Sequence, residues 1–254
     1  MLLNQMQPKT LDHFMLGNKM FDFNKFMEKY RSVIEYTGMS RMRFYEFIIP
    51  RLVSLNRPIY VMETGTMYTP SYNHTCQGAF TEILSDLIVN WTGGKLYTVD
   101  ISKEHLDLCK IYTQRASSAI EYTQSDSVEY LKNLTDDFIK NVDLFYFDSY
   151  DIDCWNPIPS ENHHFNELIS VYFRLSKNCI LAVDDNFLPN TYIKWYFLNP
   201  DGTPYKIDKI PSGKDGIGKG KKINTFLLNN GWERHSENDI PGENNLFFYH
   251  RKIN

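Results

Sequence analysis

The sequence lacks several features that would place it in a specialised class. Its four cysteines, spread over 254 residues, show no C-x-x-C spacing, which argues against a zinc knuckle and against a disulfide framework. No apolar run approaches the roughly 18 residues of a membrane span, and the opening stretch MLLNQMQPKT has no basic region followed by an apolar one. We therefore expect no membrane span and no export. Reduced thiols fit the cytoplasm best, so a cytoplasmic protein is expected.

An excess of charge of one sign is also missing. The 27 Lys and Arg residues against 31 Asp and Glu residues leave a net charge of −4, which gives no bulk attraction to nucleic acid or to an anionic membrane. Apolar residues, in contrast, make up 42% of the chain and aromatic residues 15%. This composition is typical of a globular protein with a sizeable core. The expected partner is a small molecule, and a homo-oligomer remains open.

The spacing of apolar residues changes once along the chain. Residues 10–56 carry apolar residues at helical spacing, punctuated by Gly38 and Pro50, and we interpret residues 1–56 as an N-terminal helical extension. From residue 58 on, short apolar runs alternate with amphipathic segments of helix length, which is typical of βαβ units. Strands are expected at 58–64, 95–101, 120–126, 142–148, 179–185, 232–236 and 245–251, and helices near 75–90, 103–116, 127–139, 163–176 and 219–230.

Five strand-helix units followed by two closely spaced strands predict one α/β fold. It is a Rossmann-like, seven-stranded, mostly parallel sheet with helices on both faces, over residues 57–254. The last two strands are expected to form an antiparallel hairpin at its end. In such open sheets ligands bind at the carboxyl ends of the strands, so the residues that follow each strand are the candidates for a site.

Acids or hydroxyls follow every candidate parallel strand. The strand ends carry Glu63 and Gly65, then Asp100, then Ser125-Asp126-Ser127, then Asp148, and last Asp184-Asp185-Asn186. One interpretation is that these residues begin helices as N-caps, which is common in any α/β protein. The other is that five polar strand ends converge on one ligand site. The recurrence at all five strands favours a site.

The order of these motifs resembles that of class I S-adenosylmethionine-dependent methyltransferases. The resemblance runs from about residue 58 to the end of the chain. Glu63 and Gly65 match the E-x-G start of the family's first loop, while Thr69 stands where a further glycine is usual. Asp100 matches the acid expected to accept hydrogen bonds from two ribose hydroxyls. The residues that the resemblance assigns to S-adenosylmethionine are Glu63, Gly65, Thr66, Ser71, Asp100, Ile101, Asp126, Ser127 and Asp148.

The stretches FYFDSYD and LAVDDNF narrow the resemblance to divalent-metal-dependent O-methyltransferases. The catechol and caffeoyl-coenzyme A type implies metal ligands at Asp148, Asp185 and Asn186. The bacterial sugar type implies Asp184 with Asp185 instead, so all four residues are candidate metal ligands. Their oxygen atoms suit Mg²⁺ or Mn²⁺. The alternatives are a metal-independent methyltransferase and a site in which these residues only cap the following segment.

The general base is less clear from the sequence. Relatives keep a Lys or a His three positions after the strand-four acid, where this chain has Asp151. A carboxylate beside an acceptor hydroxyl can accept its proton, so Asp151 is the first candidate. His163 and His164 are the second, because histidine titrates near neutral pH.

Two segments bear on the acceptor. Residues 149–165 are rich in aromatic residues and prolines, which suits a wall for a sugar ring. The stretch PSGKDGIGKGKK, residues 211–222, combines glycines with lysines, and it is either an anion-binding loop or a solvated one. A diffuse resemblance to methyltransferases of capsular-polysaccharide clusters favours a sugar-linked or anionic acceptor, such as a phosphate or phosphoramidate. A non-catalytic binding subunit is the alternative. A nicotinamide oxidoreductase is disfavoured, because no G-x-G-x-x-G follows the first strand.

Overall fold

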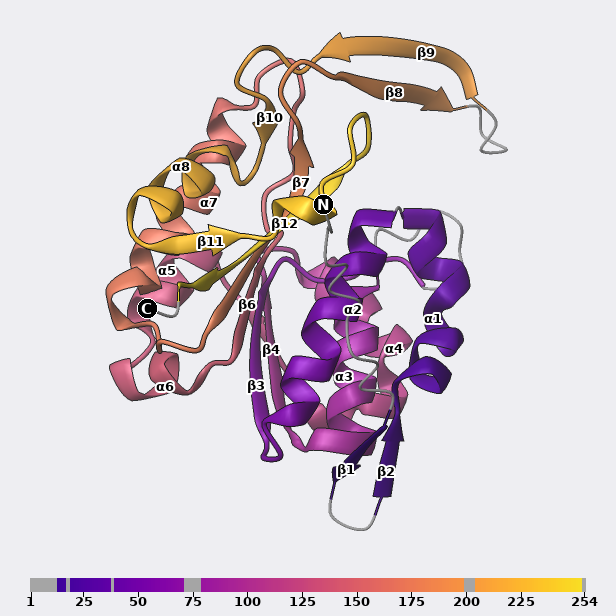
Figure 1. The fold of residues 1–254 in the computed structure, drawn as a ribbon, viewed down its shortest axis with the longest axis vertical. Helices are drawn as coiled ribbons and strands as arrows, with labels where there is room; N and C mark the ends of the chain where they lie inside the picture. Colours follow the sequence, from indigo (N-terminus) through magenta and orange to yellow (C-terminus); the bar gives the residue numbers. More distant parts are fainter. Residues whose placement is uncertain (1–12, 17–18, 38, 71–78, 199–203, 253–254) are drawn as a thin grey trace, which may run out of the picture.

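The computed structural model describes residues 13–16, 19–37, 39–70, 79–198 and 204–252 (Figure 1). Its central sheet confirms all seven strands expected from the sequence. They are β3 (Ile59–Thr64), β4 (Gly94–Asp100), β5 (Ile120–Gln124), β6 (Leu144–Phe147), β7 (Ile180–Phe187), β11 (Trp232–Arg234) and β12 (Asn245–Arg251).

The order of these strands across the sheet is β11-β12-β7-β6-β3-β4-β5. The five strands from β7 to β5 are parallel, and β12 runs antiparallel to both β7 and β11. The chain moves from β3 outward through β4 to β5 and then returns to the other side of β3 as β6. This reversal puts a topological switch point between β3 and β6, which is where ligands bind in open α/β sheets. The structure is therefore a Rossmann-like α/β fold.

Helices cover both faces of the sheet (Figure 1). Asp, Ser and Thr residues begin several of them: the side chains of Ser102, Asp126 and Thr135 each accept a hydrogen bond from a backbone N–H in the first helical turn. One face carries α1 (Phe23–Thr37), α2 (Met39–Ser54), α3 (Phe80–Leu87) and α4 (Lys103–Tyr112), and the other carries α5 (Ser127–Asn133), α6 (Asp136–Asn141), α7 (Ile158–Val171) and α8 (Lys221–Asn229). Short helical turns lie at Ile88–Thr92, Gln114–Ala119, Tyr172–Arg174 and Ser236–Asn238.

The core has two halves, one on each face of the sheet. Because successive strand residues point to opposite faces, Leu144 and Tyr146 of β6 pack toward α1–α3, whereas Phe145 and Phe147 pack toward α5–α8. Each strand of the centre is thus buried on both sides, which explains why its sequence reads as a continuous apolar run.

The N-terminal helices belong to the first half of this core. Phe44, Ile48 and Leu52 of α2 are buried together with the strand residues of that face. The helical prediction is confirmed for α1 and α2 but is wrong before them, where β1 (His13–Leu16) and β2 (Lys19–Asp22) form an antiparallel hairpin. Within segment 10–56, the apolar residues at helical spacing run from Phe23 to Leu52, so the residues before Phe23 had no such pattern of their own.

Two further elements were not expected from the sequence. β8 (Tyr192–Leu198) and β9 (Pro204–Pro211) pair as an antiparallel ribbon that projects from the main body (Figure 1). After it, β10 (Ile217–Gly218) pairs with Phe187 and Asn186 at the end of β7. The glycine- and lysine-rich segment 211–222 is therefore docked against the central sheet. Across the described part of the chain, the helices are all too short or too polar to cross a membrane.

Candidate functional site

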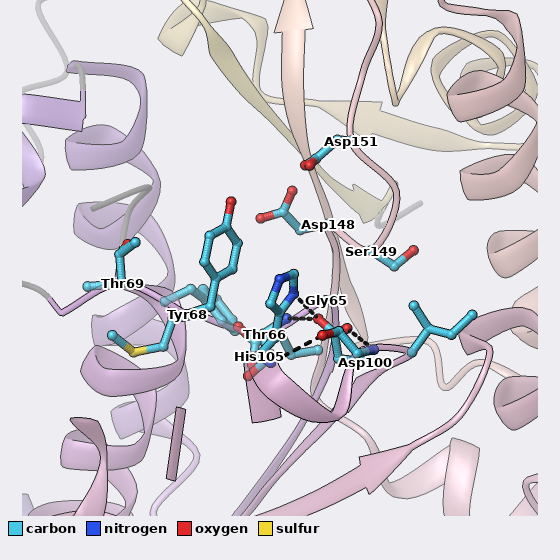
Figure 2. A pocket seen from close by; sticks show the side chains of 15 residues that line it. Gly65, Thr66, Tyr68, Thr69, Asp100, His105, Asp148, Ser149 and Asp151 are labelled. Carbon is cyan, nitrogen blue, oxygen red and sulfur yellow. Dashed lines mark hydrogen bonds and ion pairs between the residues drawn. The ribbon is translucent and has the colours of Figure 1, made fainter. Parts of the chain in front are cut away.

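A cavity opens at the carboxyl ends of β3, β4 and β6, at the switch point of the sheet (Figure 2). Its empty space is about 740 Å³, the open mouth included. Its wall is formed by Glu63, Gly65, Thr66, Met67, Tyr68, Thr69, Ala79, Phe80, Asp100, Ile101, Ser102, His105, Asp148, Ser149 and Asp151.

Gly65 lets the first loop pass close to β6. Its φ of +79° lies in the left-handed region that glycine adopts readily, and a Cβ atom there would lie 2.5 Å from the backbone oxygen of Asp148. The backbone N–H of Gly65 also donates to the carbonyl oxygen of Val99, at 2.8 Å. The loop is therefore pinned between β4 and β6, and its backbone lines the floor of the cavity.

Asp100 presents its carboxylate to the cavity from the end of β4. Oδ2 accepts a hydrogen bond from the backbone N–H of Thr66 at 3.2 Å, and Oδ1 accepts one from that of Ser102 at 2.7 Å. His105 Nδ1 lies 3.5 Å from Oδ2, and the His105 ring stacks on Tyr68 with ring centroids 4.2 Å apart. The carboxylate is held rigidly and still has lone pairs for a ligand's hydroxyl groups.

Glu63 lines the same wall but is buried behind the loop. The hydroxyl of Thr81, on α3, lies 2.9 Å from both of its carboxyl oxygens. Burial raises the pKa of Glu63 to about 8. Near neutral pH this group is therefore mostly protonated, and it ties β3 to α3.

Of the other residues predicted to bind the cofactor, some line the cavity and others do not. Thr66 and Ile101 line the cavity, and Ile101 is 70% exposed, so it offers an apolar surface beside Asp100. Asp126 caps α5 by accepting from the backbone N–H of Glu129. It is not part of the cavity wall, and neither is Ser127. Ser71 lies outside the described residues.

The two candidate histidines belong to a network behind the wall. The Ser127 hydroxyl lies 2.9 Å from His163 Nε2 and 3.3 Å from the hydroxyl of Ser149, which in turn donates to Glu167 at 2.6 Å. Burial acts to raise the pKa of Glu167, but the adjacent His164 and His163 outweigh it and lower the pKa to about 2. Ser149 is the member of this network that reaches the cavity.

His164 does not line the cavity, so its position gives no support to its predicted role as the base. Its side chain is fully buried, and Nδ1 lies 2.8 Å from the carbonyl oxygen of Ser160 one helical turn earlier. Burial lowers the pKa of His164 to about 4. His163 is not in the cavity wall either, whereas Asp151 lines the cavity with an exposed side chain.

The four predicted metal ligands do not converge on one ion site. Asp184 follows the alternation of β7 to the face of α2, where Arg41 donates to both of its carboxyl oxygens at 2.6 and 2.7 Å and the hydroxyl of Tyr146 donates at 2.5 Å. The Asn186 side chain donates to the carbonyl oxygens of Val183 and Asp184. Within the described residues, no group of three or more His, Cys, Asp and Glu side chains is arranged to hold a metal ion. The Mg²⁺ or Mn²⁺ assignment therefore stays a prediction that these contacts do not support.

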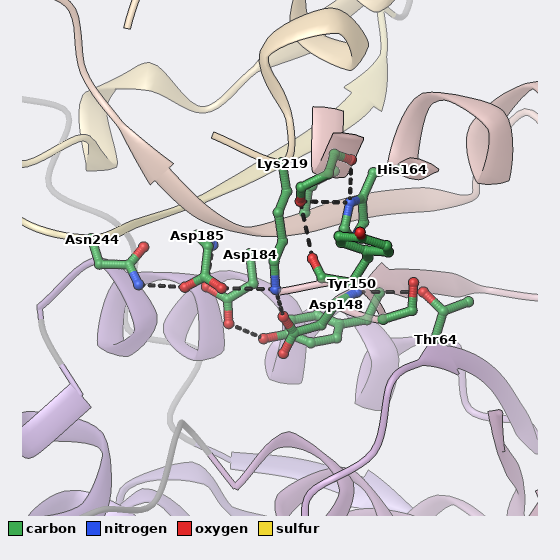
Figure 3. Close-up of polar contacts among 12 residues, drawn as sticks. Thr64, Asp148, Tyr150, His164, Asp184, Asp185, Lys219 and Asn244 are labelled. Carbon is green, nitrogen blue, oxygen red and sulfur yellow. Dashed lines mark hydrogen bonds and ion pairs between the residues drawn. The ribbon is translucent and has the colours of Figure 1, made fainter. Parts of the chain in front are cut away.

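The remaining two predicted ligands, Asp148 and Asp185, share a lysine instead (Figure 3). The ammonium group of Lys219 forms ion pairs with Asp148 Oδ1 and, at 2.7 Å, with Asp185 Oδ2. Burial acts to lower the pKa of Lys219, but the surrounding carboxylates outweigh it and hold the pKa above its usual range. Burial raises the pKa of Asp148 well above its usual range, and the nearby Asp184 and Asp185 add to this effect.

The residues that sequence reasoning missed are Lys219, Arg41, Tyr68 and His105. Arg41, Tyr45 and Ile48 lie on one helical face, so the spacing placed a charge on the buried side of α2 and indicated a buried partner. Lys219 stands between two glycines, a sign of close packing that can also mark a solvated loop. Tyr68 and His105 had no signal of their own.

Comparison with known proteins gives only distant similarities. No protein family and no curated protein matches the sequence. Among solved structures, the chain is similar to an S-adenosylmethionine-dependent methyltransferase from Clostridium acetobutylicum, at 16% identity over 89% of this chain and 97% of that one, with a TM-score of 0.46. It is also similar to an O-methyltransferase from Bacillus cereus in complex with S-adenosylhomocysteine, at 11% identity over 89% and 88% of the two chains, with a TM-score of 0.45.

A third similar structure is the glycopeptide N-methyltransferase MtfA complexed with S-adenosylmethionine, at 11% identity over 80% of this chain and 92% of that one, with a TM-score of 0.44. The structural neighbours thus include both O- and N-methyltransferases. At such low identity and TM-score, the function of this chain has to be argued from its own residues.

Proposed function

We propose that this protein binds S-adenosylmethionine in the cavity at the ends of β3, β4 and β6 and transfers its methyl group to an oxygen atom of a small acceptor. The observation that carries the proposal is the carboxylate of Asp100, which is fixed by two backbone N–H groups and faces the cavity. A carboxylate can accept hydrogen bonds from two neighbouring hydroxyl groups at once, as a ribose presents them.

The residues around Asp100 fit the rest of this cofactor. Gly65 lets the first loop lie directly against the end of β6, and this loop forms part of the cavity wall. Ile101 offers an apolar surface next to the carboxylate, suited to one face of a purine ring. The stacked rings of Tyr68 and His105 form the wall next to Asp100.

The bound cofactor would supply an activated methyl group, which passes from its sulfur to the acceptor oxygen while that oxygen gives up a proton. The contribution of the chain is alignment of the acceptor and acceptance of this proton. Asp151 is the candidate base, because it is exposed in the cavity wall. Asp148 is also in the wall, where the ammonium group of Lys219 holds its carboxylate.

For the acceptor we propose a small sugar-linked or anionic molecule, in keeping with a role in capsule or polysaccharide tailoring. Tyr150 and Trp155, which flank Asp151 in sequence, are 47% and 59% exposed and are suited to stacking on a sugar ring. Lys214 adds an exposed positive charge in the segment 211–222. The proposal includes no metal ion, because the predicted ligands are held by other groups.

Binding of S-adenosylhomocysteine, measured by isothermal titration calorimetry, tests this function. The chain should bind one equivalent, and Asp100→Ala should weaken binding by about 10- to 100-fold, or about 1.4 to 2.8 kcal/mol, since hydrogen bonds to a charged group are lost.

Asp107→Ala is the matched control, because Asp107 is a carboxylate on the surface of α4 that pairs with Lys103 and Lys110. It should bind like the unmodified chain. Equal affinity of Asp100→Ala and the unmodified chain would remove the cofactor assignment.

A further inference from the structure

Lys219 occupies the place between Asp148 and Asp185 where the sequence predicted a metal ion (Figure 3). Its side chain is 0% exposed, and its ammonium group contacts a carboxylate from β6 and another from β7. A lysine is buried in this way only when its charge is compensated.

The backbone around Lys219 is clamped to β7 on both sides of the residue. The N–H of Lys219 donates to the carbonyl oxygen of Asp185 at 3.2 Å, and that of Gly220 donates to Oδ1 of Asn186 at 2.7 Å. A Cβ atom at Gly218 or at Gly220 would lie 2.6 or 2.8 Å from the same Oδ1. Glycine on both sides therefore allows the lysine to enter the sheet edge, and the position of its ammonium group is built into the fold.

The backbone conformation and the neighbours of Asp185 favour its ion pair with Lys219. Its φ of +52° is in the left-handed region, which is uncommon for a residue other than glycine, and a register shift lies opposite, between Asn245 and Phe247 of β12. Asn244 also donates to its carboxylate, on the oxygen that Lys219 does not use. Backbone and neighbours together aim Asp185 at the lysine.

The charges in this region leave no place for a second cation. Asp184 is satisfied by Arg41, and Asp148 and Asp185 are joined by Lys219, so a divalent ion would have to enter next to an ammonium group.

We propose that the ammonium group of Lys219 is a built-in cation that takes the place of a divalent metal ion and positions Asp148 at the cavity wall. Lys219 is not in the wall itself and acts through Asp148, so it is a positioning residue. Its role in methyl transfer rests on the proposed function. The replacement of a metal ion by the lysine does not rest on the proposed function, and it can be tested without measuring methyl transfer.

The test is a titration of the full chain with MnCl₂, followed by calorimetry and by the Mn²⁺ electron paramagnetic resonance signal. The unmodified protein should bind no stoichiometric Mn²⁺. Lys219→Met removes the cation that Asp148 and Asp185 share and leaves Arg41, 3.8 Å from Asp185 Oδ1, as the nearby positive charge. This variant should bind one Mn²⁺ at least about tenfold more tightly than the unmodified protein. Lys219→Met combined with Asp185→Asn should lose that binding again.

Lys214→Met is the control, because Lys214 is an exposed lysine of the same segment, and it should behave like the unmodified protein. Stoichiometric Mn²⁺ binding by the unmodified protein that Asp185→Asn abolishes would overturn the proposal. So would a folded Lys219→Met variant that binds no Mn²⁺.

Thermal unfolding in the presence of Mn²⁺ tests the proposal even if the Lys219→Met variant is less stable. Mn²⁺ should raise the unfolding midpoint of Lys219→Met and leave that of Lys219→Arg and of the unmodified protein unchanged, since only a ligand of the folded state stabilises it. An equal rise in all three would contradict the proposal. Binding of S-adenosylhomocysteine, measured on the same samples, reports separately on the proposed function.

Discussion

At the scale of single residues, Gly65 carries two constraints that can be separated. Its positive φ alone disfavours any other residue by about 1 to 2 kcal/mol, and the approach of its Cα to β6 adds a steric contact. Gly65→Ala should therefore lower the free energy of unfolding by about 2 to 5 kcal/mol, measured by urea denaturation.

Gly231→Ala provides the matched control. Gly231 has nearly the same φ of +78°, but a Cβ atom there would meet nothing within 4 Å. This variant should lose only the conformational part, and the difference between the two variants measures the close approach of the loop to Asp148. Equal losses in both would show that the contact at Gly65 costs nothing.

Glu63 makes stability depend on pH. Burial raises its pKa in the folded protein from 4.5 to about 8, so the folded state retains a proton that the unfolded chain releases. The stabilising contribution of this proton is full below about pH 4.5 and is lost as the pH rises through about 8, at no more than about 1.4 kcal/mol per pH unit.

Glu63→Gln keeps the shape of the protonated side chain and cannot ionise. Its free energy of unfolding, measured in urea between about pH 5 and about pH 8, should fall less steeply than that of the unmodified protein. Parallel slopes for the two proteins would mean that Glu63 titrates normally.

At the scale of elements, Asn186 joins β7 to the segment that holds Lys219. Its side chain accepts from the N–H of Gly220 and donates to two carbonyl oxygens of β7. Asn186→Ala leaves these buried groups unpaired, at a cost of about 1 to 3 kcal/mol each. Amide hydrogen exchange at residues 217–220 should become faster, by mass spectrometry.

Asn162→Ala is the control for that experiment. Asn162 is exposed and contacts Lys222 at the other end of the same segment. Its removal should leave exchange at 217–220 unchanged. Slow exchange in Asn186→Ala would show that β10 is held by other contacts.

The strands of the sheet were predictable because their signal is local. Runs such as LFYF in β6 are apolar throughout, since both faces of a central parallel strand are buried. The polar strand ends were predictable for the same reason, and Gly65, Asp100, Asp148 and Asp151 do meet in one cavity.

The pairing of charges was not predictable. Asp148 and Lys219 lie 71 positions apart, and Arg41 and Asp184 lie 143 apart, so no local pattern records these partners. Carboxylates at neighbouring strand ends fit a metal ion and a buried lysine equally well until the contacts are known. The hairpin of β1 and β2 was not predicted for another reason, because it precedes the helical pattern of apolar residues, which starts at Phe23.

At the scale of the whole molecule, the N-terminal segment supplies 12 of the 29 buried residues of one core, all between Phe21 and Val53. Phe44, Ile48 and Leu52 are buried against the sheet, and each such side chain contributes about 1.5 to 3 kcal/mol, against a total stability of about 5 to 15 kcal/mol. A chain that begins at residue 57 should therefore show no cooperative thermal unfolding by circular dichroism.

Addition of a separate fragment spanning residues 1–56 should restore some cooperativity, because it returns the missing helices and the partner of Asp184. Cooperative unfolding of residues 57–254 alone, with binding of S-adenosylhomocysteine, would instead make the boundary at residue 57 that of an independent domain.

The burial of Lys219 between its two flanking glycines also has a consequence for how this site depends on the surrounding solution. An ion in solution occupies a site in proportion to its concentration, whereas a side chain is synthesised with the chain and is present once in every molecule. A site filled by Lys219 would stay filled in media depleted of divalent ions or rich in chelators. Its positive charge would be set by the gene rather than by the supply of metal.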